Sequence, residues 1–103
     1  MDRIYRWNGR YFGFIRNDRL FAADSTDIGW VDDDGRVWES DGNFLGEIVN
    51  DDYILRRTSM ATPARRAAKA RPAKPATPSR PANRAGKAGR AGWVDALDKF
   101  PDR

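Results

Sequence analysis

The 103-residue sequence contains no cysteine and no histidine. Without cysteine the chain forms no disulfide and has no thiolate, and a structural zinc site needs ligands of these two residue types. Histidine is also the side chain that most often acts as a general acid or base near neutral pH. We therefore expect a protein that is not an enzyme and that uses no cofactor or metal.

Long apolar runs are missing as well. Residues 1–13 lack the apolar run of a signal peptide, and no stretch approaches the roughly 20 apolar residues of a membrane span. These features lead us to expect a cytoplasmic protein without a membrane span.

Residues 58–91 lack acidic and aromatic residues. They hold nine Lys or Arg, a net charge of +9, whereas residues 1–57 hold eight Arg and twelve Asp or Glu, a net charge of −4. Five of the six prolines also lie in 58–91. Such a composition cannot bury enough apolar surface to offset the entropy of ordering the chain. It predicts a domain over 1–57, a disordered basic tail or linker over 58–91, and a short amphipathic segment over 92–103.

An internal repeat is the strongest signal that residues 1–57 do contain. Each unit starts with an aliphatic residue and reaches a glycine nine positions later. The starts are Ile4, Leu20 and Val37, with a fourth at Ile54, and the repeated glycines are Gly13, Gly29 and Gly46. Unit starts recur every 16 or 17 residues, a period typical of small repeated supersecondary units.

The residues within each unit favour short hairpins. Asn8-Gly9, Asp24-Ser25 and Asp41-Gly42 tolerate positive φ and close tight turns, and aromatic and β-branched residues flank them. The pattern predicts an all-β antiparallel meander of about seven strands. A glycine inside a strand indicates close approach by a ring of a neighbouring unit, or a sharp bend in the strand.

These residues resemble a known family. The pattern NGRYFGFI … RLF … IGWVDDDGRVWESDGNFLGEIV … YIL, over about residues 3–57, is similar to the small bacterial family called the 4-fold beta flower protein. The resemblance implies an all-β domain with a quasi-four-fold arrangement of hairpins, and it carries no functional residue over to this chain. The stretch GWVDDDGRV also resembles a single unit of the WG-type repeats.

Large apolar residues return after the basic segment. Ala91-Gly92-Trp93-Val94 fits the glycine strand and would complete the fourth unit. The spacing of Trp93, Val94, Leu97 and Phe100 instead favours one apolar face of a short helix, which we prefer because the residues after Val94 make a poor strand. We expect these four side chains either to dock on the chain's own domain or to bind a partner protein.

The aromatic content suggests a crowded core. Ten aromatic residues lie within 1–57, and a core of this size can hardly enclose them all. We therefore expect self-association, with a carbohydrate or peptide platform of surplus rings as a less favoured alternative to core packing.

The basic segment is the main functional candidate. Its Ala, Pro and Lys content resembles the tails of bacterial nucleoid-associated and linker-histone-like proteins. Scattered charges without aromatic residues suit phosphate contacts and no base readout. The residues expected to bind nucleic acid or another polyanion are Arg65, Arg66, Lys69, Arg71, Lys74, Arg80, Arg84, Lys87 and Arg90. Three alternatives are an inert linker within a protein–protein scaffold, an anionic membrane surface, and attachment to the acidic domain itself.

The remaining candidates are weaker. The acidic turns at 32–35 and 50–52 offer oxygen ligands for calcium, but they lack the spacing of a calcium-binding loop, and hairpin turns favour Asp and Gly for backbone reasons alone. Serine residues without a neighbouring base do not indicate nucleophilic catalysis.

Overall fold

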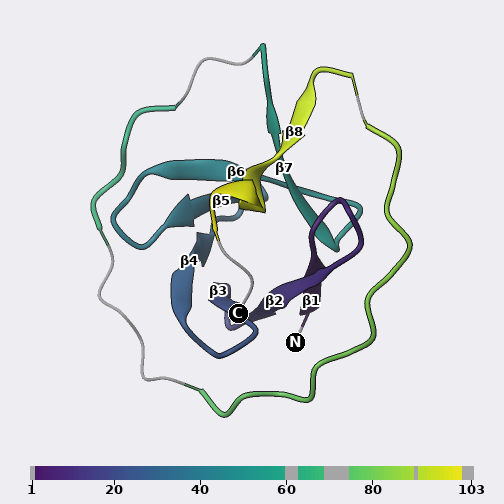
Figure 1. Ribbon diagram of the computed structural model, residues 1–103. Coiled ribbons are helices and arrows are strands. Elements are labelled where there is room, and N and C mark those ends of the chain that lie inside the picture. The colour runs from purple at the N-terminus through teal and green to yellow at the C-terminus, as the bar shows by residue number, and fades with distance from the viewer. Residues whose placement is uncertain (1, 60–62, 69–74, 90, 101–103) are drawn as a thin grey trace.

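The computed structural model describes residues 2–59, 63–68, 75–89 and 91–100. Each strand pairs with the next in an antiparallel meander whose sheet order follows the chain (Figure 1). The strands are β1 (Asp2–Tyr5), β2 (Tyr11–Arg16), β3 (Arg19–Ala22), β4 (Asp27–Val31), β5 (Arg36–Glu39), β6 (Phe44–Val49), β7 (Tyr53–Arg57) and β8 (Trp93–Asp95), and the 3₁₀ helix η1 (Ala96–Lys99) follows. The predicted all-β meander is confirmed.

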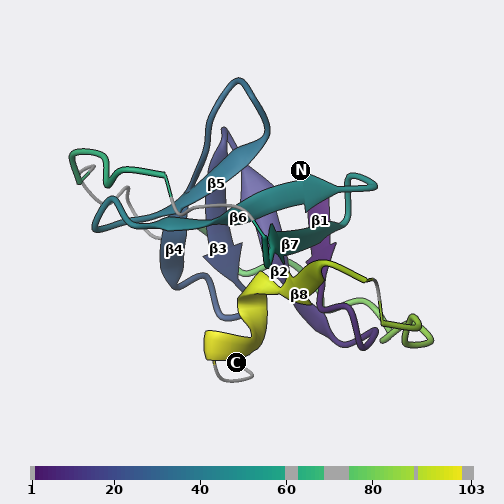
Figure 2. The ribbon, with the colours of Figure 1, turned by 90° about the horizontal axis from the view of Figure 1, so that it is seen from above.

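The sheet curves so that its first and seventh strands meet. Seen from above, β3 and β4 run across the direction of β6 (Figure 2). The Tyr5 N–H donates to the Asp52 carbonyl over 2.8 Å and links the end of β1 to the turn before β7. Turns close this compact arrangement with positive φ at Gly9 and Gly42, as their sequence predicts.

The repeated glycines occupy equivalent positions in the sheet. Gly13, Gly29 and Gly46 pair with the start residues of their own units, and the pairing register shifts immediately after each start residue. A Cβ on Gly13 would overlap the carbonyl oxygen of Phe21, and one on Gly29 would overlap that of Trp38. Close approach is therefore confirmed, but a strand carbonyl makes the approach, not an aromatic ring as one alternative had it.

The C-terminal residues add an eighth strand to the sheet, next to the start of the fourth unit. Trp93–Asp95 forms a strand on β7, with Arg57 paired to Trp93 and Leu55 to Asp95. The preference for a helix starting at Trp93 is wrong for this part, because Trp93–Asp95 is a strand as the alternative had it. Gly92 does not occupy the position of the repeated glycines, however, since its carbonyl accepts the Thr58 N–H and it does not pair with the start residue Ile54. The short helix begins only at Ala96, because the Asp95 carboxylate accepts the Leu97 N–H and caps it.

Three apolar clusters fill the interior. The largest joins the aliphatic start residues of all four units to Ala96 and Leu97, and the two others are aromatic. Nine of the ten aromatic side chains of residues 1–57 are buried, and Trp7 is half-buried. The core thus encloses nearly all the rings, more than its size leads us to expect, and the C-terminal element and the basic segment contact five of them: Tyr5, Trp7, Phe12, Trp38 and Tyr53.

The described parts of the basic segment form neither helix nor strand. Residues 63–68 and 75–89 nevertheless follow the rim of the domain in extended form (Figure 1) and make main-chain hydrogen bonds to it. This arrangement differs from the unattached coil that the composition predicts. It corresponds to the alternative in which the basic segment attaches to the acidic domain.

Candidate interaction site: the basic segment on the rim of the domain

The segment passes the hairpin turns of the repeat in reverse order. Arg66 lies at the turn of the third unit, Thr77 at that of the second and Arg84 at that of the first. One repeated surface of the domain thus meets successive residues of one extended chain.

Arg84 docks on the first turn through its backbone. Its N–H donates to the Gly9 carbonyl over 2.7 Å. A Cβ on Gly9 would overlap the Arg84 carbonyl oxygen, so this approach requires glycine. Gly9 also has a φ of +94°, a conformation that other residues rarely adopt.

The Arg84 side chain contacts an aromatic ring, that of Tyr5, and the carboxylate of Asp52. Its guanidinium carbon lies 3.9 Å from the centre of the Tyr5 ring, and its Nη1 lies 2.6 Å from Asp52 Oδ2. The hydrogen bond to Asp52 raises the pKa of Arg84 above its ordinary value. We call Tyr5, Gly9 and Asp52 the first station.

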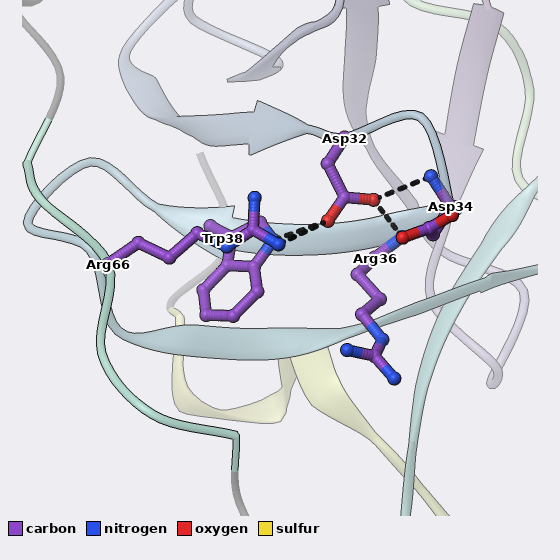
Figure 3. Close-up of polar contacts among 5 residues, drawn as sticks. All are labelled: Asp32, Asp34, Arg36, Trp38 and Arg66. Carbon is purple, nitrogen blue, oxygen red and sulfur yellow. Dashed lines mark hydrogen bonds and ion pairs between the residues drawn. The ribbon is translucent and has the colours of Figure 1, made fainter.

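Arg66 repeats this arrangement on the third unit. Its N–H donates to the Gly42 carbonyl over 2.9 Å, and its carbonyl oxygen lies where a Cβ on Gly42 would be. The guanidinium carbon lies 4.3 Å from the Trp38 ring centre, and Nη2 lies 3.3 Å from Asp32 Oδ2 (Figure 3). Trp38, Gly42 and Asp32 form the second station.

Asp32 is held ready for this contact by its own turn. Its Oδ1 accepts the N–H groups of Asp34 and Arg36, and its Oδ2 accepts the Trp38 indole N–H over 3.0 Å (Figure 3). Burial acts to raise the pKa of Asp32, but these hydrogen bonds and the Arg66 charge lower it below the ordinary 3.8. The acidic turn at 32–35 therefore has a structural use, as the turn interpretation predicts.

The second unit differs at the position of the docking glycine. Ser25 occupies it with a φ of +68° and is only 1% exposed. No arginine is described against this turn in residues 63–68 and 75–89; instead, the Ser25 hydroxyl lies 3.0 Å from that of Thr77.

Lys87 makes a further cation–π contact, with the rings of Trp7 and Tyr53. Its N–H donates to the Trp7 carbonyl over 3.0 Å, and its Nζ lies 5.7 Å from the Trp7 ring centre and 5.4 Å from that of Tyr53. The Trp7 indole in turn donates to the Ala88 carbonyl over 2.9 Å. A third basic side chain thus covers aromatic surface of the domain.

The other predicted basic residues are spread along the same segment. Arg65 donates to the Asp41 carbonyl, and Arg80 is exposed. The predictions for Lys69, Arg71, Lys74 and Arg90 lie outside the described residues.

The four predicted partner-binding residues face different surroundings. Leu97 is fully buried in the domain's own core, and Phe100 packs against it with its ring 5.9 Å from that of Phe12. Val94 is 49% exposed, next to a cavity of about 430 Å³ that Trp7 and Trp93 also line. Leu97 and Phe100 therefore dock on the chain's own domain.

The domain residues of the stations were not predicted to bind the basic segment, although Asp32 and Asp52 lie in the acidic turns weighed as calcium ligands. The station residues are Tyr5, Gly9, Asp32, Trp38, Gly42 and Asp52. Two weak signals for them exist in the sequence. Arg-Ala pairs occur at 66–67, 84–85 and 90–91, and two of the three mid-unit turns carry glycine where the third carries serine.

The described residues hold no cluster of three or more potential metal-ligating His, Cys, Asp or Glu side chains. Within the same residues, no helix is long and apolar enough to cross a membrane.

Four short hairpin units in one antiparallel sheet, clasped by an extended segment, define a small all-β repeat protein. The family model of the 4-fold beta flower protein matches residues 1–96, and the chain belongs to this family. Comparison with the curated proteins and with the solved structures returned no match.

Proposed function

We propose that the protein is a non-enzymatic interaction module that binds nucleic acid, or a comparable polyanion, through the basic segment. One observation carries this proposal: Arg65, Arg66, Arg80, Arg84 and Lys87 are all exposed along an extended stretch of a segment without any acidic residue. Even the two arginines at the stations keep 47% and 43% of their side-chain surface exposed.

Electrostatics determine what such a segment recognises. Lys and Arg side chains displace condensed counterions from phosphates, which gives affinity without base readout. The segment has no aromatic residue on which bases would stack. Because Asp32 and Asp52 already pair with Arg66 and Arg84, a polyanion competes with the domain for these two side chains.

Salt-dependent binding of the full chain to a random DNA duplex tests the proposal. We expect affinity to fall steeply between about 50 and 200 mM salt. The double variant Arg65→Gln/Arg80→Gln should lower the log–log slope by about 2, since each engaged charge contributes about 0.9.

A matched control uses two exposed arginines of the domain. Arg3→Gln/Arg16→Gln changes the net charge equally but lies outside the segment. Equal effects of the two double variants would contradict a role specific to the segment, and absence of binding by the full chain at 50 mM would reject the proposal. Whole-chain variants are preferred to a fragment of residues 1–57, because Leu97 belongs to the core.

A protein–protein scaffold is the second candidate, and Val94 favours it. This exposed apolar side chain adjoins the cavity lined by Trp7 and Trp93, which an apolar partner side chain would fit. In this case, replacing residues 63–86 with a Gly/Ser linker of equal length, which keeps Lys87 and Gly89 at the cavity, should leave partner capture intact, whereas Val94→Asp should abolish it. Under the polyanion proposal the linker replacement abolishes DNA binding and Val94→Asp does not.

A further inference from the structure

We infer that the two stations are arginine-binding sites, and that they accept the basic segment of a second copy of this chain when their own segment is withdrawn. The inference concerns binding by the β domain and is independent of nucleic-acid binding. The net charge of the domain alone does not explain these sites. The inference rests on the contact geometry that the two stations share.

The same contacts occur at both stations. In each, an arginine N–H donates to a glycine carbonyl, over 2.7 Å at Gly9 and 2.9 Å at Gly42. In each, the arginine carbonyl oxygen occupies the space where the glycine would carry a Cβ, and alanine follows the arginine. Two independent turns of the repeat thus hold the same dipeptide in the same way.

The side-chain contacts match as well. Each guanidinium carbon lies within a cation–π distance of an aromatic ring, 3.9 Å at Tyr5 and 4.3 Å at Trp38. Tyr5 and Trp38 are equivalent residues, since each follows the aliphatic start of its unit. A carboxylate on a neighbouring turn completes each station, with N–O distances of 2.6 Å to Asp52 and 3.3 Å to Asp32.

The second unit provides an internal comparison. Ser25 stands there in place of the docking glycine, and at the two glycine turns a Cβ would overlap the arginine carbonyl. The described segment passes this turn with Thr77. Within residues 63–68 and 75–89, the two turns with glycine are thus the ones against which an arginine is described.

These contacts specify the ligand: an extended peptide with an arginine whose backbone reaches the glycine turn. A planar guanidinium stacks on a ring and pairs with a carboxylate at once, which an ammonium does less well. The sequence that fits the stations in this structure is the chain's own. We therefore take residues 81–87 or 63–68 of a second copy as the ligand that binds from another chain. Within one chain, tethering gives the segment an effective concentration of about millimolar order and keeps trans ligands out.

A variant with an emptied first station makes the inference testable. Arg84→Glu places a negative charge beside Asp52 and should expel the segment from the first station, and Arg84 is exposed, so the core is not disturbed. The probe is a capped peptide with the sequence of residues 81–87. We expect saturable shifts of the Tyr5, Gly9 and Asp52 amide resonances of the labelled variant, titrated to about 10 mM peptide.

Control peptides separate recognition of arginine from general attraction. Citrulline in place of arginine keeps the shape without the charge and should bind at least about tenfold more weakly. Equal binding of the citrulline peptide, or of a scrambled peptide with the arginine at its end, would overturn the inference. So would a lack of saturable shifts both in Arg84→Glu and in a second emptied variant, Arg84→Ala.

Two further variants test the glycine and the second copy. Adding Gly9→Ser to Arg84→Glu imitates the Ser25 turn and should abolish the peptide-induced shifts. Unlabelled Gly9→Ser chain, whose own residues 81–87 are displaced, should shift the same resonances of labelled Arg84→Glu chain. If it does not, a second copy is not the occupant; if it does, the exchange is one route to the self-association expected from the sequence.

Discussion

At the scale of single residues, the strand glycines tolerate no side chain because a neighbouring backbone fills the space. A Cβ on Gly29 would overlap the carbonyl oxygen of Trp38 in the paired strand, where neither partner can rotate away. We expect Gly29→Ala to lower the unfolding free energy by about 3 kcal/mol or more, as overpacking at a rigid site does.

Gly89→Ala is the control for this change. Apart from Gly89 itself and its two chain neighbours, no described atom lies within 4 Å of the position where its Cβ would be. Its effect should stay within about 0.5 kcal/mol in chemical denaturation. Similar losses for both variants would mean that the backbone approach at Gly29 is not what demands glycine.

Arg6 shows how one buried cation secures the C-terminal turn. Its Nη1 and Nη2 each donate over 2.7 Å, to the carbonyls of Leu97 and Phe100, and the side chain is 5% exposed. Arg6→Ala leaves these acceptors without the donor and should cost about 2–4 kcal/mol of unfolding free energy. The exposed Arg16→Ala, measured by the same denaturation, should change stability little; equal costs would contradict the role assigned to Arg6.

Asp32 predicts how stability depends on pH. Its folded-state pKa lies below the ordinary 3.8, so its contribution is present above that pH and is lost as pH falls through the folded pKa. Asp32→Asn should therefore cost about 1 kcal/mol or more at pH 7, and the difference from the unaltered chain should shrink below about pH 4.

Denaturation of both chains across this pH range checks the prediction. Asp33→Asn is the matched control, because Asp33 is exposed in the same turn. A difference for Asp32→Asn that stays constant down to pH 2 would show that the hydrogen bonds of Asp32 do not depend on its charge.

At the scale of elements, local signals predict the meander well and the long-range contacts poorly. Turn pairs such as Asn8-Gly9 and the glycine period are properties of neighbouring residues, and they predict the meander of about seven strands that β1 to β7 form. The register of β8 on β7 is set across the intervening 58–91 segment, where local preference has no influence. The docking of Arg66 and Arg84 cannot be predicted from local sequence either. The segment that carries them is of low complexity, and the turns that they contact have sequences that close hairpins whether or not a segment docks there.

Leu97 tests whether the C-terminal element is part of the fold. It is fully buried among the unit-start residues, so Leu97→Ala should leave a cavity and cost about 2–5 kcal/mol. Val94→Ala, at a side chain 49% exposed, should cost under about 1 kcal/mol. Thermal or chemical denaturation compares them; a small loss for Leu97→Ala would mean that residues 93–99 are not needed for stability.

At the scale of the whole molecule, the described parts of a basic segment, residues 63–68 and 75–89, lie along the rim of a domain of opposite charge (Figure 1). The rings that residues 1–57 could not enclose alone are covered partly by the cations of this segment, at Tyr5, Trp38, Trp7 and Tyr53. Composition alone suggests an unattached tail, because its few apolar groups give it no core of its own. The attachment instead depends on charge and on backbone hydrogen bonds to the domain.

Salt should therefore loosen the segment before it affects the β core. The pairs Arg84–Asp52 and Arg66–Asp32 are partly exposed, and the Debye length falls from about 10 Å at 0.1 M salt to about 3 Å at 1 M. We expect trypsin to cleave after Arg84 severalfold faster at 1 M salt, relative to a free peptide with the sequence of residues 75–89 that corrects for the protease itself. Circular dichroism should show the sheet unchanged over the same range. Cleavage after Arg84 that keeps pace with the free peptide at both salt concentrations would show that the ion pairs do not hold the segment, and the stations would then rest on their backbone and aromatic contacts alone.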